Sequence, residues 1–307
     1  MIMTTKLIID GSNALHRAYW QAESNKLDST YNDIYDVGTI YIFLKSLKAT
    51  VEKFKSDEIW ITWDKKIKHP STNFRKELAQ NLYKKQRDPE KTLKVHEYHD
   101  RLSEWLDLLG VYQLYPYVLE ADDVISWLAQ TNKDGNNIIV SMDKDLLQLV
   151  SNNTTIYNPI KKIMTTPVNF ESITGVKIEN YVYYKALLGD TSDNVEGVGG
   201  YGKVKSKKLA ELGAEIIKTK LSEEDYALFT KNMQMMDLSD SFTKEIGEVE
   251  CYLQQCEEIS KNIKPNIKGF EVKCEENGLL QFSRKISEWK RNFDPMENTL
   301  VRLLSNL

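Results

Sequence analysis

Nine carboxylates fall into five short clusters, and each cluster lies where an apolar run ends or passes into a loop or helix. The nine are Asp10, Asp64, Glu120, Asp122, Asp123, Asp143, Asp145, Asp190 and Asp193. Runs such as KLIID and EIWITWD are rich in β-branched residues, which favour strands. In an open α/β sheet the strands end along one edge, and ligands bind in the crevice beyond those ends. The spacing therefore predicts that many acids converge on one small volume.

Carboxylates that lie close together cannot all stay ionised unless cations lie among them. Carboxylate oxygens are the hard ligands that Mg²⁺ and Mn²⁺ prefer. The pattern therefore predicts a site for two or more Mg²⁺ ions, with Mn²⁺ as a substitute. When each cluster is taken alone, a plainer interpretation is open. Asp122 and Asp123 would be helix N-caps, and the acids of SMDKD and GDTSDN would form polar turns.

Apolar runs alternate with segments of helical periodicity along the first half of the chain. Strands are expected at 6–10, 58–63, 111–116 and 136–141, and helices at 35–54, 96–110, 121–130 and directly after Asp143. This alternation predicts an α/β fold with a mostly parallel central sheet. After about residue 160 the pattern becomes helical, with a helix at 179–190, a glycine-rich stretch at 197–202 and a lysine-rich helix from 203.

The composition is that of a globular protein. Of the 307 residues, 41% are hydrophobic and 28% are charged, and the chain is long enough to bury a sizeable core. No apolar run approaches 18 residues, and the N-terminus does not have the pattern of a signal peptide. Three cysteines cannot form an even disulfide framework, which suits a reducing compartment. We expect a cytoplasmic monomer with no membrane segment.

The total charge says little about the partner of this protein. Lys and Arg number 41 and Asp and Glu 45, so the formal net charge is −4. Setting aside the nine clustered acids leaves 36 acids against 41 bases, so the rest of the chain is at +5. The positions of the basic residues therefore matter more than their sum.

A basic insert follows the second expected strand and leaves the sheet at the acidic edge. Residues 65–101 hold eleven Lys and Arg against five acids, with Phe74 and Tyr83 among them. Lys and Arg attract a phosphate backbone, and aromatic rings offer stacking surfaces for bases. Beside a metal site, this composition indicates a nucleic-acid substrate. The alternative for the insert is a solvated helical face or a disordered loop.

The glycine-rich stretch GVGGYGKV matches two nucleotide-binding patterns in spacing but not in context. A dinucleotide fingerprint follows a strand, whereas an expected helix and a polar loop precede Gly197. A P-loop ends in a hydroxyl residue that binds Mg²⁺, and this chain has Val204 at that position. A glycine hairpin before a lysine-rich helix suits the DNA backbone better, because its N–H groups and the helix N-terminus can approach a phosphate.

Six segments, in this order, resemble the motifs of the 5′ nuclease family, which comprises flap endonucleases and 5′–3′ exonucleases. The segments are DGSNALHR, WD at 63–64, FRKELAQNLYKKQR at 74–87, EADD, SMDKD and GDTSDNVEGVGGYG. The resemblance extends over about residues 6–210. Because no polymerase module is present, it is closest in kind to the stand-alone enzymes of bacteriophages, which act in the host cytoplasm. The chain departs from the family pattern at Val204, Lys205 and Ser206, which follow the hairpin.

The resemblance implies a division of the chain and a role for each site residue. A PIN-like or Rossmann-like catalytic core would cover 1–165, with residues 65–101 as a helical arch. A DNA-binding helix–three-turn–helix would cover 166–215, and a mainly α-helical region 216–307. One metal site is assigned to Asp10, Asp64, Glu120, Asp122, Asp123 and Asp143, and a second to Asp145, Asp190 and Asp193. The expected catalytic residues are Lys84, Arg87 and Asp143, and the first two would contact the scissile phosphate. The expected DNA-binding residues are Arg75, Lys84, Lys85, Arg87, Gly197, Gly199, Gly200, Gly202, Lys203 and Lys205.

The implied activity is metal-dependent hydrolysis of phosphodiesters near the 5′ ends or flaps of DNA and RNA–DNA, as in the removal of primers during replication. A single-strand-binding protein or a clamp is a candidate partner for the C-terminal region. Two other classes stay open at this point, namely a P-loop-like NTPase acting on nucleic acid and a non-catalytic DNA-structure-binding module. The sequence also leaves open the balance between exonuclease, flap endonuclease and RNase H activity.

Overall fold

The computed structural model describes residues 4–27, 37–68, 73–79, 83–84 and 89–294 of the chain. Lys85 and Arg87, two of the expected DNA contacts, lie outside the described residues. The described strands are β1 (Thr5–Asp10), β2 (Glu58–Thr62), β3 (Tyr112–Leu114), β4 (Asn136–Val140), β5 (Thr154–Asn158) and β6 (Ile163–Thr165).

These strands form one sheet in the order β3-β2-β1-β4-β5-β6, and all neighbours are parallel except β5 and β6. The predicted α/β fold with a mostly parallel sheet is therefore confirmed. Successive strands lead outward from β1 to β2 and β3, and the chain then returns to the other side of β1 as β4. The strand order reverses at β1, and a crevice for a ligand forms at such a reversal, beyond the carboxyl ends of the strands.

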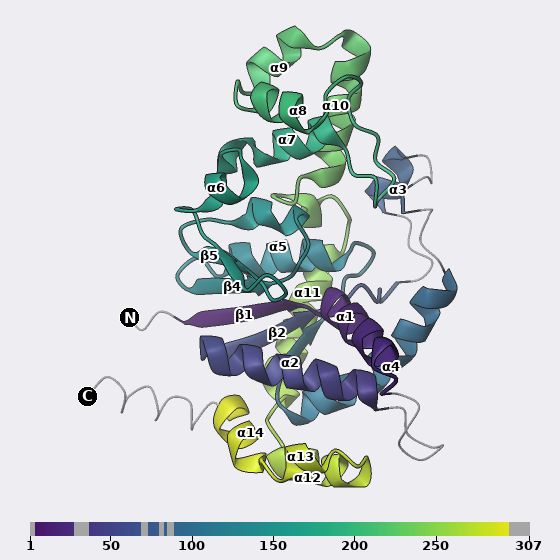
Figure 1. Ribbon diagram of the computed structural model, residues 1–307, viewed down its shortest axis with the longest axis vertical. Coiled ribbons are helices and arrows are strands. Elements are labelled where there is room, and N and C mark those ends of the chain that lie inside the picture. The colour runs from purple at the N-terminus through teal and green to yellow at the C-terminus, as the bar shows by residue number, and fades with distance from the viewer. Residues whose placement is uncertain (1–3, 28–36, 69–72, 80–82, 85–88, 295–307) are drawn as a thin grey trace, which may run out of the picture.

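Helices cover both faces of the sheet and continue beyond it (Figure 1). The α-helices are α1 (Gly11–Ser24), α2 (Gly38–Phe54), α3 (Phe74–Leu78), α4 (Pro89–Leu108), α5 (Ala121–Thr131), α6 (Phe170–Thr174), α7 (Tyr181–Leu188), α8 (Lys203–Ala210), α9 (Ala214–Lys220), α10 (Glu223–Met236), α11 (Glu248–Asn262), α12 (Ile267–Glu276), α13 (Leu280–Ser283) and α14 (Ile286–Phe293). The 3₁₀ helices are η1 (Asp145–Leu149), η2 (Ile178–Asn180) and η3 (Ser241–Thr243). No helix in the described part of the chain is both long enough and apolar enough to cross a lipid bilayer.

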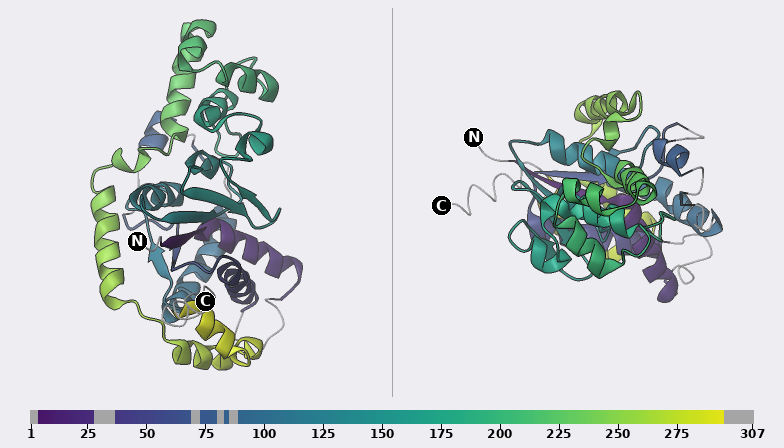
Figure 2. Two further views of the ribbon diagram at one scale, coloured as in Figure 1. Left: turned by 90° about the vertical axis from the view of Figure 1, so that its left-hand side faces the viewer. Right: turned by 90° about the horizontal axis from the view of Figure 1, so that it is seen from above.

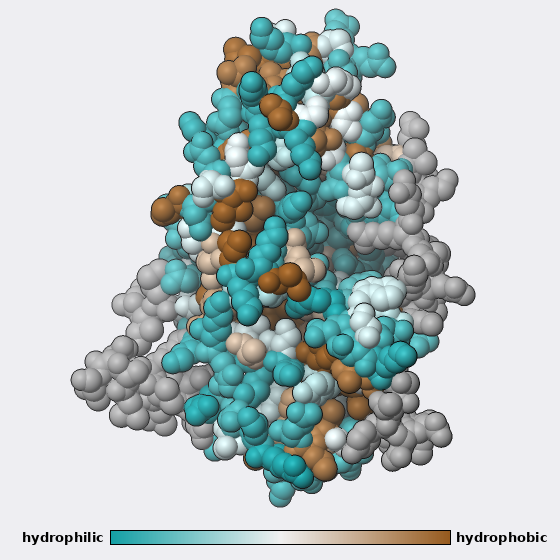
Figure 3. All heavy atoms as spheres, viewed as in Figure 1, coloured by the Kyte–Doolittle hydropathy of each residue, from teal (hydrophilic) through white to brown (hydrophobic). Residues whose placement is uncertain are grey.

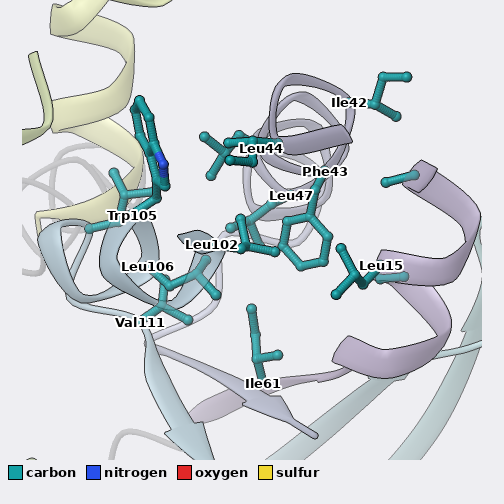
Figure 4. Close-up of a cluster of buried hydrophobic side chains, with 14 of the residues drawn as sticks. Leu15, Ile42, Phe43, Leu44, Leu47, Ile61, Leu102, Trp105, Leu106 and Val111 are labelled. Carbon is teal, nitrogen blue, oxygen red and sulfur yellow. The ribbon is translucent and has the colours of Figure 1, made fainter. Parts of the chain in front are cut away.

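Alternating side chains of β1 enter two separate hydrophobic cores. Leu7 and Ile9 join the core beneath α1, α2 and α4, whereas Ile8 joins the core on the α5 side. Figure 4 shows part of the first core, where Phe43 of α2, Leu102 of α4 and other apolar side chains converge over β2. Because each fully buried side chain of this size contributes roughly 1.5–3 kcal/mol, the two cores hold β1 firmly from both faces. Asp10, the last residue of β1, is therefore fixed at the sheet edge.

The helices after β6 are distributed over three places. Helices α7 to α10 form one end of the molecule, and α12 to α14 lie at the other end against α2 and α4 (Figure 1). Between the two ends α11 runs alongside the sheet (Figure 2, left), where Tyr252 packs against Trp127 of α5. The described part of the region expected at 216–307 thus contributes to the α7–α10 end and also packs beside the sheet and against α2 and α4.

Two local expectations need correction. The segment after Asp143 forms the short 3₁₀ helix η1 rather than an α-helix, because the chain must turn into β5 only four residues after η1 ends. Beyond residue 160, where only helices were expected, β6 adds an antiparallel edge strand of three residues. A strand this short shows no alternation that could be recognised in the sequence.

Candidate active site

The acidic clusters meet at the carboxyl edge of the three central strands. Asp10 ends β1, Asp64 follows the end of β2 by two residues, and Asp143 follows the end of β4 by three. Since β2, β1 and β4 are neighbours in the sheet, these three positions share one edge. Glu120 and Asp122 stand at the N-terminus of α5, which packs against β1 and β2. The sheet thus brings together acids that are more than 100 residues apart.

Hydrogen bonds tie these carboxylates to the loops around them. Asp10 accepts from the backbone N–H of Asn13 at 2.9 Å and from the Ser141 hydroxyl at 2.7 Å. The Ser141 oxygen in turn accepts from the backbone N–H of Asp143 at 3.0 Å. Asp64 accepts from the backbone N–H of Ala121 at 3.0 Å and so caps α5. Asp123 accepts from the backbone N–H of Glu120, Asp143 from that of Asp145 and Asp190 from that of Ser192, so the capping interpretation is confirmed for Asp123 and the turn interpretation for Asp143 and Asp190.

Within this acid group, charge repulsion and burial favour protonation. Burial, assisted by the charges of Asp64 and Asp143 and opposed by hydrogen bonds from Asn13 and Ser141, raises the pKa of Asp10 to about 7. Burial also raises the pKa of Asp122 well above its ordinary value, with contributions from Asp143 and Asp10. A divalent cation among these oxygens would reduce the repulsion and favour the ionised forms of Asp10 and Asp122. Their chemistry and electrostatics therefore fit a Mg²⁺ or Mn²⁺ site.

A lysine and a tyrosine from the basic insert reach into the site at Glu120. The Lys84 ammonium donates to Glu120 at 2.7 Å, and the Tyr83 hydroxyl donates to Glu120 at 2.9 Å and to Asp193 at 3.2 Å. Burial alone would raise the pKa of Glu120, but Lys84 and Arg75 outweigh it and lower this pKa to about 2. Tyr83, expected to offer a stacking surface, is thus a hydrogen-bond donor to two acids.

The backbone at Lys84 is held in an unusual conformation. Its φ is 56°, in the left-handed region that non-glycine residues seldom adopt, and its N–H donates to the carbonyl of Asp193 at 3.0 Å. Strained residues of this kind concentrate at functional sites, where the surrounding structure holds them in place. Lys84 therefore connects the insert to the second acidic cluster, which comprises Asp145, Asp190 and Asp193, through its backbone as well as its side chain.

The second acidic cluster contains a lysine that the sequence analysis missed. Lys185 of α7 lies 2.7 Å from Asp145 and donates to Asp190 at 2.9 Å. Despite burial, Ser192 and Lys185 lower the pKa of Asp190 to about 2, whereas burial raises that of Asp145 to about 6 against the effect of Lys185. The signal in the sequence was the lysine of KALLGD, which lies five residues before Asp190 at the end of an expected helix.

Arg75 and Asp123, expected as a DNA contact and a metal ligand, form a buried ion pair with each other. Arg75 is 2% exposed and Asp123 is fully buried. The Arg75 guanidinium donates to both Asp123 oxygens, at 2.8 and 2.7 Å, and its Nε donates to the Met235 carbonyl at 2.8 Å. Asp123 also accepts from the backbone N–H of Glu120 at 3.0 Å. In this structure Asp123 is thus the counter-ion of Arg75.

The glycine-rich hairpin joins α7 to α8, so it follows a helix and not a strand. A Cβ at Gly197 would lie 2.2 Å from the Leu188 carbonyl oxygen, so this glycine is needed for packing. At Gly200, with φ of 78°, a Cβ would meet no atom within 4 Å, and Gly199 and Gly202 are open in the same way. Lys203 and Lys205 are exposed in the first turn of α8. The hairpin and the helix start therefore offer N–H groups and cations to an approaching phosphate.

In the structure, lysine ammoniums lie against the acids at two places. Among the described residues, no three His, Cys, Asp or Glu side chains stand close enough to hold one ion together. Lys84 and Lys185 supply the positive charge instead. The face of the molecule in Figure 3 is largely hydrophilic, with isolated apolar side chains.

Acids at the carboxyl edge of a parallel sheet, next to basic side chains and an open glycine hairpin, define an enzyme that acts on phosphodiesters. Comparison with known proteins agrees. The model of the 5′-3′ exonuclease N-terminal resolvase-like domain matches residues 5–175, which is more than half of the chain. The chain therefore belongs to the 5′–3′ exonuclease family, whose members are 5′ nucleases that hydrolyse the phosphodiesters of DNA.

Two bacterial relatives and one phage structure illustrate the similarity. The 5′-3′ exonuclease of Buchnera aphidicola is 31% identical over 199 residues, which span 64% of this chain and 66% of that protein. The 5′-3′ exonuclease of Halalkalibacterium halodurans is 27% identical over 268 residues, spanning 83% of this chain and 87% of that protein. The flap endonuclease of bacteriophage T5, solved with DNA and metal ions, shares the fold with a TM-score of 0.65 at 17% identity, over 84% of this chain and 98% of that one.

Proposed function

We propose that this 5′ nuclease uses two divalent metal ions, Mg²⁺ or Mn²⁺, to hydrolyse phosphodiesters near the 5′ ends and flaps of DNA and RNA–DNA. The observation that carries the proposal is the group of carboxylates at the edge of β2, β1 and β4, where Asp10, Asp64 and Asp143 follow three neighbouring strands. The solved phage relative, which contains both DNA and metal ions, supports the assignment of this group to catalysis.

Each acid group has its own part in the proposed reaction. Asp10, Asp64, Asp122 and Asp143 would hold the first ion, joined by Glu120 once Lys84 moves away. Asp145, Asp190 and Asp193 would hold the second after Lys185 is displaced. When bound, such ions activate a water molecule and stabilise the leaving oxygen of an in-line displacement. Asp123 is excluded from the ligand set because Arg75 occupies it.

Lysines and backbone N–H groups would position the substrate. Lys84, released from Glu120, can reach a phosphate bound between the acids and the basic insert. Lys203 and Lys205 with the open glycines of the hairpin would grip the duplex backbone without reading its sequence. Such contacts fix the register of the duplex, so the distance from the hairpin to the acids would set which bond is cut. Arg87 and Lys85 complete the proposed set but lie outside the described residues.

We assign the enzyme to the processing of primers and flaps in replication, with a nuclease domain of the phage type. The fold match to the T5 enzyme over 98% of its length supports this assignment. RNA–DNA is included among the substrates because contacts to the phosphate backbone do not distinguish the sugars.

A gel assay tests the proposal directly. The purified protein is incubated with a 5′-labelled DNA flap in Mg²⁺, in Mn²⁺ and in EDTA, and product lengths are read. We expect short 5′ products with either metal and none with EDTA. Binding of the flap without cleavage in any metal would support a non-catalytic DNA-structure-binding module instead.

A further inference from the structure

A buried glutamate outside the acidic clusters holds the loop that leads to Glu120. Glu248, the first residue of α11, is fully buried. Its carboxylate accepts from the backbone N–H groups of Tyr117 at 2.8 Å, Val118 at 2.9 Å and Leu119 at 3.3 Å. The Tyr252 hydroxyl donates to the same carboxylate at 2.6 Å. Three successive N–H groups around one buried anion form a strong and directional contact.

Two helical turns further along α11, a second residue, Gln255, binds the same loop. The Gln255 side chain accepts from the backbone N–H of Tyr115 at 2.9 Å and donates to its carbonyl at 2.8 Å. Helix α11 therefore contacts the backbone of residues 115–119 at four positions immediately before Glu120. None of these contacts can be made by a chain that lacks α11.

The opposite side of this loop holds the start of the basic insert. The N–H of Ile67 donates to the carbonyl of Pro116, and that of Lys68 to the carbonyl of Tyr117, both at 3.0 Å. The Lys66 ammonium donates to the Val118 carbonyl at 2.7 Å. Loop 115–119 is thus a junction between α11, the insert and Glu120, which itself binds Lys84 of the insert.

We infer that Glu248 is a positioning residue for the nuclease, which fixes loop 115–119 and through it both Glu120 and the base of the insert. This inference rests on the proposed function for its effect on catalysis, but the contact itself is independent of it. A displacement of about 1 Å at a reacting group can cost about 100-fold in rate. The C-terminal region therefore helps to position residues of the active site, in addition to any docking function.

Glu248→Gln tests this role, because glutamine keeps the size but loses one acceptor oxygen and the charge. Glu257→Gln is the matched control, since Glu257 lies on the same helix, is exposed and pairs only along the helix with Lys261 at 2.6 Å. Two quantities are measured for each variant at a temperature where circular dichroism shows it folded. They are the hydrogen–deuterium exchange of peptides covering 115–120 and the Mg²⁺ concentration that gives half of the maximal single-turnover rate.

We expect Glu248→Gln to speed exchange in 115–120 but not in α14, and to raise the Mg²⁺ midpoint by about 10-fold, as loss of an orienting partner of a ligand does. Glu257→Gln should change neither quantity. If Glu248→Gln fails to fold, Gln255→Ala, which loses only the contacts to Tyr115, should show the same changes to a smaller degree. Unchanged exchange, or faster exchange with an unchanged Mg²⁺ midpoint, overturns the inference. Absence of cleavage by the wild-type protein refutes the proposed function instead, and the exchange result then still decides whether Glu248 holds the loop.

Discussion

Arg75 was expected to bind DNA because it lies in the basic insert, but in the structure it forms a buried ion pair with Asp123. Replacing Arg75 with Met leaves a fully buried carboxylate without its partner. Each hydrogen bond to a charged group is worth about 1.5–3 kcal/mol, and breaking a buried pair costs about 3–5 kcal/mol. We therefore expect Arg75→Met to lower the free energy of unfolding by about 3–5 kcal/mol, a large part of the total stability of a typical protein.

Urea denaturation followed by circular dichroism measures this loss. The double variant Arg75→Met/Asp123→Leu is the critical companion, because apolar side chains can replace a buried pair at little cost. It should recover most of the stability that the single variant loses. Recovery would show that the uncompensated charge of Asp123, and not a general loss of packing, causes the destabilisation.

The salt dependence of DNA affinity tests whether Arg75 also contacts a phosphate. Removing one phosphate contact lowers the slope of log affinity against log salt by about 1. We expect Arg75→Met to leave this slope unchanged, whereas Lys205→Ala, at an exposed position of α8, should lower it without affecting stability. A variant at Arg75 with wild-type stability and a reduced slope would refute the structural role and restore the DNA contact predicted from the sequence.

Three further predictions concern the acids and their lysines. Lys84→Ala should lower the single-turnover cleavage rate by about 100-fold while changing DNA affinity little, because its ammonium lies at Glu120; an equal loss in both quantities would make Lys84 a general backbone contact. Asp190→Asn should abolish cleavage and leave flap binding, measured in EDTA, within about twofold of wild type, and retained turnover would remove Asp190 from the site. Without metal, the pKa of Asp10 is raised from 3.8 to about 7, so between these pH values the folded chain binds more protons than the unfolded chain. Its free energy of unfolding therefore falls as the pH rises through this range. For Asp10 alone, the free energy of unfolding falls by at most about 4 kcal/mol across this range. Mg²⁺ should therefore raise the melting temperature more at pH 8 than at pH 5. A larger rise at pH 5 would contradict a metal site at Asp10.

Strands β1 to β4 and the acids that follow them could be predicted because both depend on local sequence, whereas β5 and β6 were missed. The runs KLIID and NNIIV predict buried strands, and the carboxyl ends of neighbouring parallel strands lie at the same edge of the sheet. The convergence of Asp10, Asp64 and Asp143 then follows from topology alone. The expected helix–hairpin–helix at 179–210 was likewise confirmed, since glycine spacing and helical periodicity are both read within a short window.

The pairings that tune the site could not be predicted in this way. From the sequence, Arg75 was expected to contact DNA because it lies in a basic insert. Only the fold shows that Arg75 is buried and paired with Asp123, which lies 48 residues away. Glu248 lies 128 residues after the Glu120 that it helps to position, in a tail with no recognisable motif. Such partners are chosen by tertiary contacts, to which periodicity and composition give no access.

The most direct test of the account compares two aspartates at opposite ends of β4. Asp143 follows its carboxyl end in the acidic group, whereas Asp134 is exposed in the turn before its amino end. The measurement is the single-turnover cleavage rate of a 5′ flap in Mg²⁺ with enzyme in excess. The account predicts a rate at least about 1,000-fold below wild type for Asp143→Asn and a wild-type rate for Asp134→Asn. Wild-type turnover by Asp143→Asn would contradict the claim that the carboxylates at this sheet edge carry out the reaction.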